Sequence, residues 1–219
     1  MSSLKREAFL LLDPFHALGR SFCAFVARRG ELPIAVSEDP DAGSEFSVRM
    51  ALEGTCVPHR TIHTSFPDAE LRLAQDLGQV FGGIRGMVSF FPLPVRRENW
   101  LELPLTAANE LVRESVNRRL RLLRALAPLL ERRGFLQNVI MGVIDEDGSP
   151  VSRVDEATAH LWDDLLAGEW ERRGVLVRRT YTRMVASDGG SFETLFEDLD
   201  RVQADFERCL QQTRLPGAA

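Results

Sequence analysis

The apolar positions of the chain switch repeatedly between helical and strand spacing. Residues 3–29 favour a helix that breaks and restarts at Asp13-Pro14, because Pro suits a first helical turn and Asp can cap it. The restarted helix is amphipathic and is expected to end at Gly30. Its apolar positions recur every three or four residues: Phe15, Leu18, Phe22, Phe25 and Val26.

Three strands are predicted next, at residues 32–37, 45–52 and 55–65. Residues 38–44, with Asp, Pro and Gly, predict a turn between the first two. In the second strand the larger apolar side chains occupy every other position, which is the period of a strand with one buried face. These positions are Phe46, Val48, Met50 and Leu52.

A second helix is predicted from Pro67-Asp68 to Gly82-Gly83, followed by strands at 84–93 and 99–103 that are joined by a turn at 94–98. Thr106 is expected to cap the longest helix, which extends to about residue 133. One side of this helix is apolar. The opposite arc carries arginines, of which five are candidate binding residues: Arg113, Arg118, Arg121, Arg124 and Arg132.

After Gly134 the pattern predicts a strand at 138–145, a helix at 155–173, a strand at 175–185 and an acidic helix at 192–212. We therefore expect two units. Residues 1–134 form the first, and residues 135–219 form a βαβα extension that packs on the sheet of the first.

Composition narrows the class of protein without naming a reaction. The hydrophobic fraction is 44%, the charged fraction is 27%, and the net charge of −5 implies no bulk attraction to nucleic acid or to an anionic membrane. No segment approaches the roughly 20 apolar residues of a membrane span. Cys23, Cys56 and Cys209 are too widely spaced for a disulfide framework or a metal knot, so we expect a reducing cytoplasm.

Candidate metal-binding groups are each outweighed by an ordinary structural explanation. His59 and His63 lie in a strand-like run, where they would be about 13 Å apart and too far to share one ion. Asp145 and Asp147 lie at the end of an apolar strand, a place where some magnesium sites have their carboxylate ligands. However, Asp147-Gly148 is also a common turn sequence. No metal ligand and no cofactor is predicted.

Two further patterns are equally weak. Arg153 and His160 could share a helix face, a spacing seen in some helical ribonucleases, yet it recurs often by chance. Residues 187–191 precede a helix and could bind an anion through backbone N–H groups, but they lack the lysine of a phosphate loop. Aromatic residues in strands, such as Phe90 and Trp100, could stack bases and are more often part of a core.

The arginine arc is the one surface with a functional hypothesis. A basic helix face can neutralise phosphates, which makes binding dependent on salt. Alternatively, Glu110 and Glu114 precede Arg113 and Arg118 at the spacing of intrahelical ion pairs, or the acidic last helix covers the arc.

The order helix, three strands, helix, two strands, helix over residues 3–133 resembles class I type III secretion chaperones and YbjN-like proteins. The stretch that looks most like them is AELRLAQDLGQVFGGIRGMVSFFPLPVRRENWLELPLTAANELV, residues 69–112. The resemblance implies a dimer that binds other proteins and has no catalytic motif. The residues after 134 depart from the pattern of that family.

Together these observations predict an α+β fold, with a mainly antiparallel twisted sheet, flanking helices and the C-terminal α/β extension. The expected function is that of a non-enzymatic, chaperone-like or adaptor protein that binds a partner protein, as a cytoplasmic homodimer. The alternative is a nucleic-acid-linked binding protein that uses the arginine arc. A metal-dependent hydrolase around Asp145, Asp147, Asp163 or His160 is the third possibility.

Overall fold

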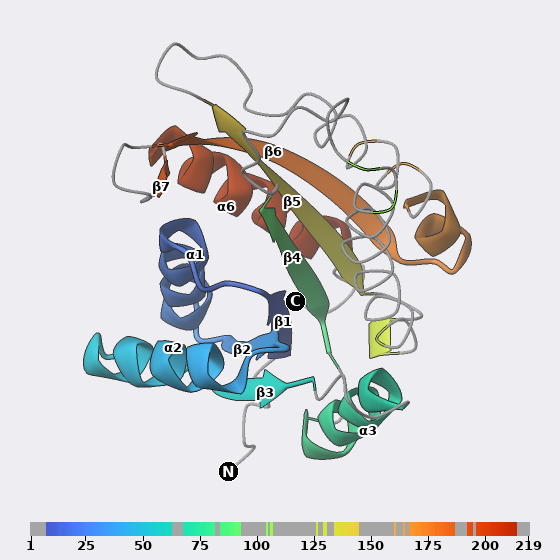
Figure 1. Ribbon diagram of the computed structural model, residues 1–219. Coiled ribbons are helices and arrows are strands. Elements are labelled where there is room, and N and C mark those ends of the chain that lie inside the picture. The colour runs from blue at the N-terminus through green and yellow to red at the C-terminus, as the bar shows by residue number, and fades with distance from the viewer. Residues whose placement is uncertain are drawn as a thin grey trace.

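The structure is a computed structural model in which one sheet is covered on both faces by helices (Figure 1). It describes the following residues: 8–62, 68–81, 84–92, 104, 106, 126, 129–130, 134–144, 160, 164, 167–186, 192–194 and 196–213.

The described elements alternate between strands and helices up to residue 92. In order they are β1 (Ala8–Leu12), α1 (Ala17–Arg28), β2 (Leu32–Ser37), α2 (Pro40–Leu52), β3 (His59–Thr61), α3 (Ala69–Phe81), β4 (Gly86–Pro92), β5 (Phe135–Ile144), β6 (Leu176–Ala186), β7 (Phe192–Thr194) and α6 (Phe196–Thr213).

The seven strands form one sheet in the order β3-β2-β1-β4-β5-β6-β7. Neighbouring strands from β3 to β6 are parallel, and only β7 is antiparallel to its neighbour β6. After β1, the chain adds β2 and then β3 on one side of it. It then returns to add β4 on the other side of β1, followed by β5, β6 and β7. This is the arrangement of a doubly wound, Rossmann-like α/β fold.

The predicted antiparallel α+β sheet is therefore wrong. An antiparallel pair can be joined by a short hairpin, whereas parallel neighbours need a crossover, usually a helix. In the predicted order, residues 32–65 formed three successive strands without a helix. The structure places α2 in that interval, which makes β2 and β3 parallel neighbours.

The mistaken strand at 45–52 has a specific cause. Phe46, Val48, Met50 and Leu52 alternate in sequence, but in a helix only the members four residues apart share a face. Phe46 and Met50 are buried in α2, while Val48 is 61% exposed and Leu52 is 85% exposed. The side chain of Asp39 caps this helix by accepting hydrogen bonds from the N–H groups of Asp41 and Ala42.

The start of the chain is also corrected. Residues 8–12, predicted as the first part of a broken helix, form β1, and all five side chains are buried. A strand at the centre of a parallel sheet is covered on both faces, so its sequence is a continuous apolar run without alternation. Such a run cannot be distinguished from a buried helix by its period.

Other elements agree with the sequence. The strands predicted at 32–37, 84–93, 138–145 and 175–185 are confirmed as β2, β4, β5 and β6, and the helices after 14, 67 and 192 as α1, α3 and α6, within a few residues at their ends. Gly30, with φ of 82°, lies just after α1. The strand predicted at 99–103 and most of the long helix from Thr106 lie outside the described residues.

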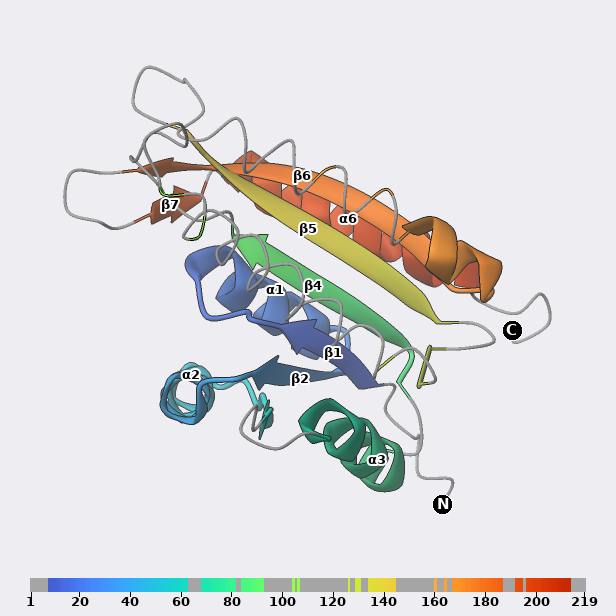
Figure 2. The same ribbon diagram turned by 45° about the vertical axis from the view of Figure 1, so that its right-hand side comes forward.

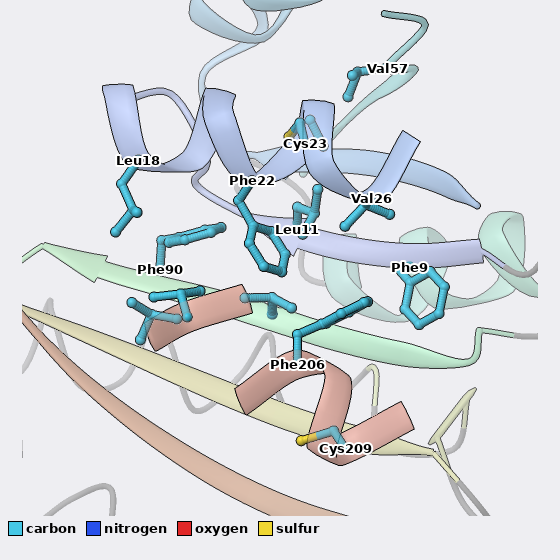
Figure 3. Close-up of a cluster of buried hydrophobic side chains, with 14 of the residues drawn as sticks. Phe9, Leu11, Leu18, Phe22, Cys23, Val26, Val57, Phe90, Phe206 and Cys209 are labelled. Carbon is cyan, nitrogen blue, oxygen red and sulfur yellow. The ribbon is translucent and has the colours of Figure 1, made fainter. Parts of the chain in front are cut away.

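Each face of the sheet packs on its own set of helices (Figure 2). Helices α1, α2 and α6 cover one face, and α3 covers the other together with Trp170. On the first face Phe206 of α6 lies among the rings of Phe9, Phe22 and Phe135, at centroid distances of 5.1, 5.3 and 5.4 Å. These rings come from β1, α1 and β5, so one side chain joins both halves of the chain. Figure 3 shows the rings of Phe206, Phe9 and Phe22.

A buried polar network also attaches α6 to the sheet. Asp205, 6% exposed, accepts hydrogen bonds from Arg178 at 2.9 Å and from the Thr180 hydroxyl at 2.9 Å. The amide of Gln137 donates to both the Thr180 hydroxyl and the Val202 carbonyl, each at 3.0 Å. The network links β5, β6 and α6, and it pairs the buried Thr180 hydroxyl and the Asp205 carboxylate, which burial would otherwise penalise.

We expect Asp205→Ala to lower the free energy of unfolding by about 2–3 kcal/mol, because it leaves Thr180 and the half-exposed Arg178 without their acceptor. Asp200→Ala, at an exposed position of the same helix, should change it by less than about 0.5 kcal/mol. Urea unfolding of the two variants checks this. Equal effects would mean that the network contributes nothing beyond helix propensity.

Candidate functional site

The carboxyl ends of β1 and β4 mark the place where the chain reverses its direction of building the sheet. In open α/β sheets, ligands bind in the crevice outside the carboxyl ends of the strands at such a switch point. Here β1 ends at Leu12, which is paired with Val36 of β2 on one side and with Ser89 of β4 on the other. The turn that follows, residues 13–16, leads directly into α1 and lies at the carboxyl end of β1.

The backbone of the turn is tight. Asp13 has φ of 52°, and among the described residues it is the one non-glycine position with positive φ. Its N–H donates to the Val36 carbonyl at 3.0 Å, which ties the turn to β2. A Cβ on Gly19 would lie 2.3 Å from the Pro14 carbonyl oxygen, so the first turn of α1 approaches the turn too closely for any larger residue.

His16 caps α1 with its own ring. Nδ1 of His16 accepts a hydrogen bond from the Gly19 N–H at 3.1 Å, and the ring meets Phe90 of β4 edge-on at 5.0 Å. Burial, and secondarily the positive charge of Arg20, lower the pKa of His16 to about 4. At neutral pH the ring is therefore uncharged and its proton is on Nε2, because Nδ1 is the acceptor. Nε2 is buried and has no hydrogen-bond partner among the described residues.

The side of the turn nearer β2 and β3 is lined by rings. Phe15 meets Phe46 of α2 at 5.1 Å and the ring of His59 at 6.1 Å, both edge-on. Nε2 of His59 lies 3.1 Å from the Ser37 hydroxyl at the carboxyl end of β2. A Cβ on Gly43 would lie 1.9 Å from the His59 ring, so the imidazole packs directly on the backbone of α2.

His59 is therefore a structural link between β2, β3 and α2. Burial, followed by the charge of Arg60, lowers the pKa of His59, and the carboxylate of Asp39 opposes them. The neutral ring suits its position among Phe15, Ser37 and the α2 backbone. His63, the second member of the weak pair in the sequence, lies outside the described residues, and no cluster of three metal-ligating side chains occurs among those that are described.

The remaining sequence candidates have different outcomes. The arginine arc, Arg113, Arg118, Arg121, Arg124 and Arg132, lies outside the described residues, as do the candidates Asp145, Asp147, Arg153 and Asp163 and residues 187–191. His160 stacks on Tyr181 of β6 at 4.3 Å. Phe90 is buried in the core as predicted.

Sequence reasoning missed the residues that follow the carboxyl end of β1. Asp13 was predicted as the cap of the restarted helix and Phe15 and His16 as part of that helix, and none was considered as part of a site. The available signal was the apolar run Ala8–Leu12, which ends at Asp-Pro. This pattern is also typical of a buried strand that is followed by a tight turn. It lacked the glycines that usually identify this turn.

The same fold occurs in solved structures of dehydrogenases. The 2-keto-3-deoxy-D-gluconate dehydrogenase of Streptococcus agalactiae matches with a TM-score of 0.65 at 15% sequence identity, covering 87% of this chain and 76% of that chain. The citronellol catabolism dehydrogenase AtuB of Pseudomonas aeruginosa PAO1 matches with a TM-score of 0.65 at 14% identity, covering 82% and 75%. No protein-family model and no curated protein matches the sequence. At these identities the likeness concerns the fold alone.

These neighbours overturn the family and function expected from the sequence. The resemblance to secretion chaperones and YbjN-like proteins is wrong, because the sheet of this chain is parallel from β3 to β6 and the solved structures that match it are dehydrogenases. The expectation of a non-enzymatic chaperone-like adaptor depended on that resemblance and is wrong with it. The nucleic-acid-binding alternative and the metal-dependent hydrolase gain no support from the neighbours either.

Gly19 provides a test of the close approach at the turn. Gly19→Ala should lower the free energy of unfolding by about 2 kcal/mol or more, because the new methyl group meets backbone rather than a movable side chain. Gly168→Ala is the matched control, since nothing lies within 4 Å of its Cβ position and alanine favours the helix by up to about 1 kcal/mol. Thermal and urea unfolding of both variants would measure the difference, and equal stabilities would contradict the geometry of the turn.

The buried His16 predicts a pH dependence of stability. Its pKa is about 4 in the folded chain against 6.5 when unfolded, so the unfolded state binds more protons between these values and stability falls as the pH is lowered through that window. From pH 7 to pH 5 the wild type should lose about 2 kcal/mol more than His16→Asn, which keeps a capping acceptor and does not titrate. Urea unfolding at both pH values measures this. His59 is present in both proteins, so its titration cancels, and an identical loss in both would contradict the buried state of His16.

Proposed function

We propose that this chain is an oxidoreductase that acts on a small organic molecule in the crevice at the carboxyl ends of β1, β2 and β4. The observation that carries the proposal is the strand order, which reverses between β1 and β4 as in doubly wound enzymes. This reversal leaves the ends of two adjacent strands without a helix connecting across them, and ligand crevices form there.

The structural neighbours support the class of ligand. Both are named as dehydrogenases, one of 2-keto-3-deoxy-D-gluconate and one of citronellol catabolism, and both names refer to small organic compounds. Each superposition covers more than four fifths of this chain. Because a fold alone hosts many functions, the specific substrate has to follow from residues of this chain.

The residues at this edge are of the kind that line small-molecule sites, mainly apolar with a few polar groups. Phe15 and Phe90 contribute rings, and Ser37 and the half-buried Asp13 contribute polar atoms. Asp13 lies between the ends of β1 and β2, through its hydrogen bond to Val36. Asp13 is therefore a charged residue that directly follows the end of β1.

The cellular location and the oligomeric state of the protein accompany the proposal. We place it in the cytoplasm, because Cys23, Cys56 and Cys209 are free thiols, and burial raises the pKa of the Cys23 and Cys209 thiols. None of the described helices is long and apolar enough to cross a membrane. The homodimer expected from the family resemblance stays a prediction, and the chaperone-like fold no longer supports it.

The experiment is a thermal-shift screen of the full chain with hydroxy acids, keto acids, primary alcohols and aldehydes. We expect at least one class to raise the unfolding midpoint, because a ligand that binds only the folded state stabilises it by about 2.7 kcal/mol at 100 times its Kd. Turnover of each hit is followed by mass spectrometry as a two-electron change in the presence of an added redox dye, which takes up or supplies the two electrons. A screen in which no class binds would remove the proposal.

Asp13→Asn locates the ligand, because asparagine tolerates the positive φ and removes the negative charge. A carboxylic acid bound in the crevice should bind several-fold more tightly to this variant, since repulsion at close range is relieved. Binding of a neutral alcohol should change little. Glu53→Gln, exposed at the end of α2, is the control. Identical affinities of an acidic hit in all three proteins would place the ligand away from β1.

A further inference from the structure

The turn between β1 and α1 is where the fold of this chain would be expected to hold a dinucleotide. In sheets with this strand order, the pyrophosphate lies at the N-terminus of the first helix, and a glycine-rich turn makes room for it. One glycine allows the tight turn, one lets the backbone approach the pyrophosphate, and one packs the helix closely on the strand. The turn of this chain meets only part of these requirements.

Residues 13–18 contain no glycine. The position with positive φ is taken by Asp13, which brings a carboxylate into a turn that would have to face a dianionic pyrophosphate. Pro14, the next residue, has no N–H to donate. Gly19 alone fulfils one of the three roles, the close packing, because its Cβ position lies 2.3 Å from the Pro14 carbonyl oxygen.

Three backbone donors at this turn and in the first turn of α1 are bonded within the protein. The N–H of Asp13 donates to the Val36 carbonyl, the N–H of Gly19 to Nδ1 of His16, and the N–H of Arg20 to the His16 carbonyl. An anion at a helix N-terminus is held by such N–H groups. Here the imidazole of His16 serves as the cap, so a phosphate would have to displace a buried ring.

Side chains of the turn also take up the space on both sides of it. The ring of Phe15 extends toward α2 and β3, where it meets Phe46 and His59. The ring of His16 extends the other way and meets Phe90 of β4. Glycines in these positions would leave the backbone open to a ligand, whereas two aromatic rings fill the same space with groups that are packed on the core.

We infer that this turn rejects the pyrophosphate of a nicotinamide or flavin dinucleotide, so the cofactor expected from the fold does not bind at β1 and α1 of this chain. The inference rests on the proposed crevice site and limits what that site accepts. The small-molecule ligand binds without a dinucleotide held at the turn.

The experiment titrates the full wild-type chain with NADH, NADPH and FAD by calorimetry and by ligand fluorescence, with inorganic pyrophosphate as competitor. We expect no saturable binding up to about 1 mM, which corresponds to a binding free energy weaker than about −4 kcal/mol. This titration needs no variant, so it does not depend on the folding of any substituted chain.

Should binding be observed, Asp13→Asn and His16→Ser decide where it occurs. Serine is a good capping residue, so His16→Ser keeps a capped helix while it removes the ring. A Kd that stays within threefold of wild type in both variants, with no competition by pyrophosphate, places the dinucleotide elsewhere and supports the inference. A tenfold change in either variant, or displacement by pyrophosphate, overturns it.

The outcomes are separable from those of the proposed function. A small-molecule screen without hits removes the crevice site and leaves the dinucleotide titration as an independent result on the turn. Tight dinucleotide binding that responds to Asp13 or His16 removes the inference alone, and it would strengthen the assignment as an oxidoreductase.

Discussion

Burial of β1 on both faces is the constraint on which the rest of the molecule depends. Its five side chains contribute to both hydrophobic cores, with Phe9 and Leu11 in one and Leu10 and Leu12 in the other. A strand covered in this way has to be central, and the two strands that flank it, β2 and β4, both follow it in the sequence and lie on opposite sides of it. The position of β1 thus creates the switch point.

Helix α6 stabilises this arrangement of strands. Phe206 packs against rings from β1, α1 and β5, while Asp205 on the same helix accepts hydrogen bonds from β6. The apolar contacts supply the driving force for burial, and the polar network fixes the orientation of the helix on the sheet, since an unpaired buried carboxylate would be costly. Both halves of the chain are therefore held in one sheet.

The fold and the turn give different information about function. The strand order is that of a doubly wound, Rossmann-like α/β fold, which this chain shares with the two solved dehydrogenases. The turn after β1 contains Asp13, Phe15 and His16, of which His16 accepts a hydrogen bond from α1 and both rings pack on neighbouring elements. A doubly wound sheet can keep its core and its crevice while this turn changes, because the core depends on apolar burial and cofactor binding depends on a few turn residues.

The sequence by itself determined the elements whose period is unambiguous. The amphipathic spacing of Leu18, Phe22 and Val26 identified α1, and the apolar runs before Asp145 and after Arg173 identified β5 and β6. These features are local, so the side chains that form them are neighbours along the chain.

Only the tertiary structure decided which strands are paired and what lies at their ends. The pairing of Leu12 with both Val36 and Ser89 joins residues far apart in sequence, and no local pattern records it. The nature of residues 8–12 and 45–52 was decided in the same way, by burial on two faces in the first case and on one helix face in the second. The physical reason is that a side chain is buried by its neighbours in space, so the position of the site, at Asp13 to His16, followed only once β1 was placed between β2 and β4.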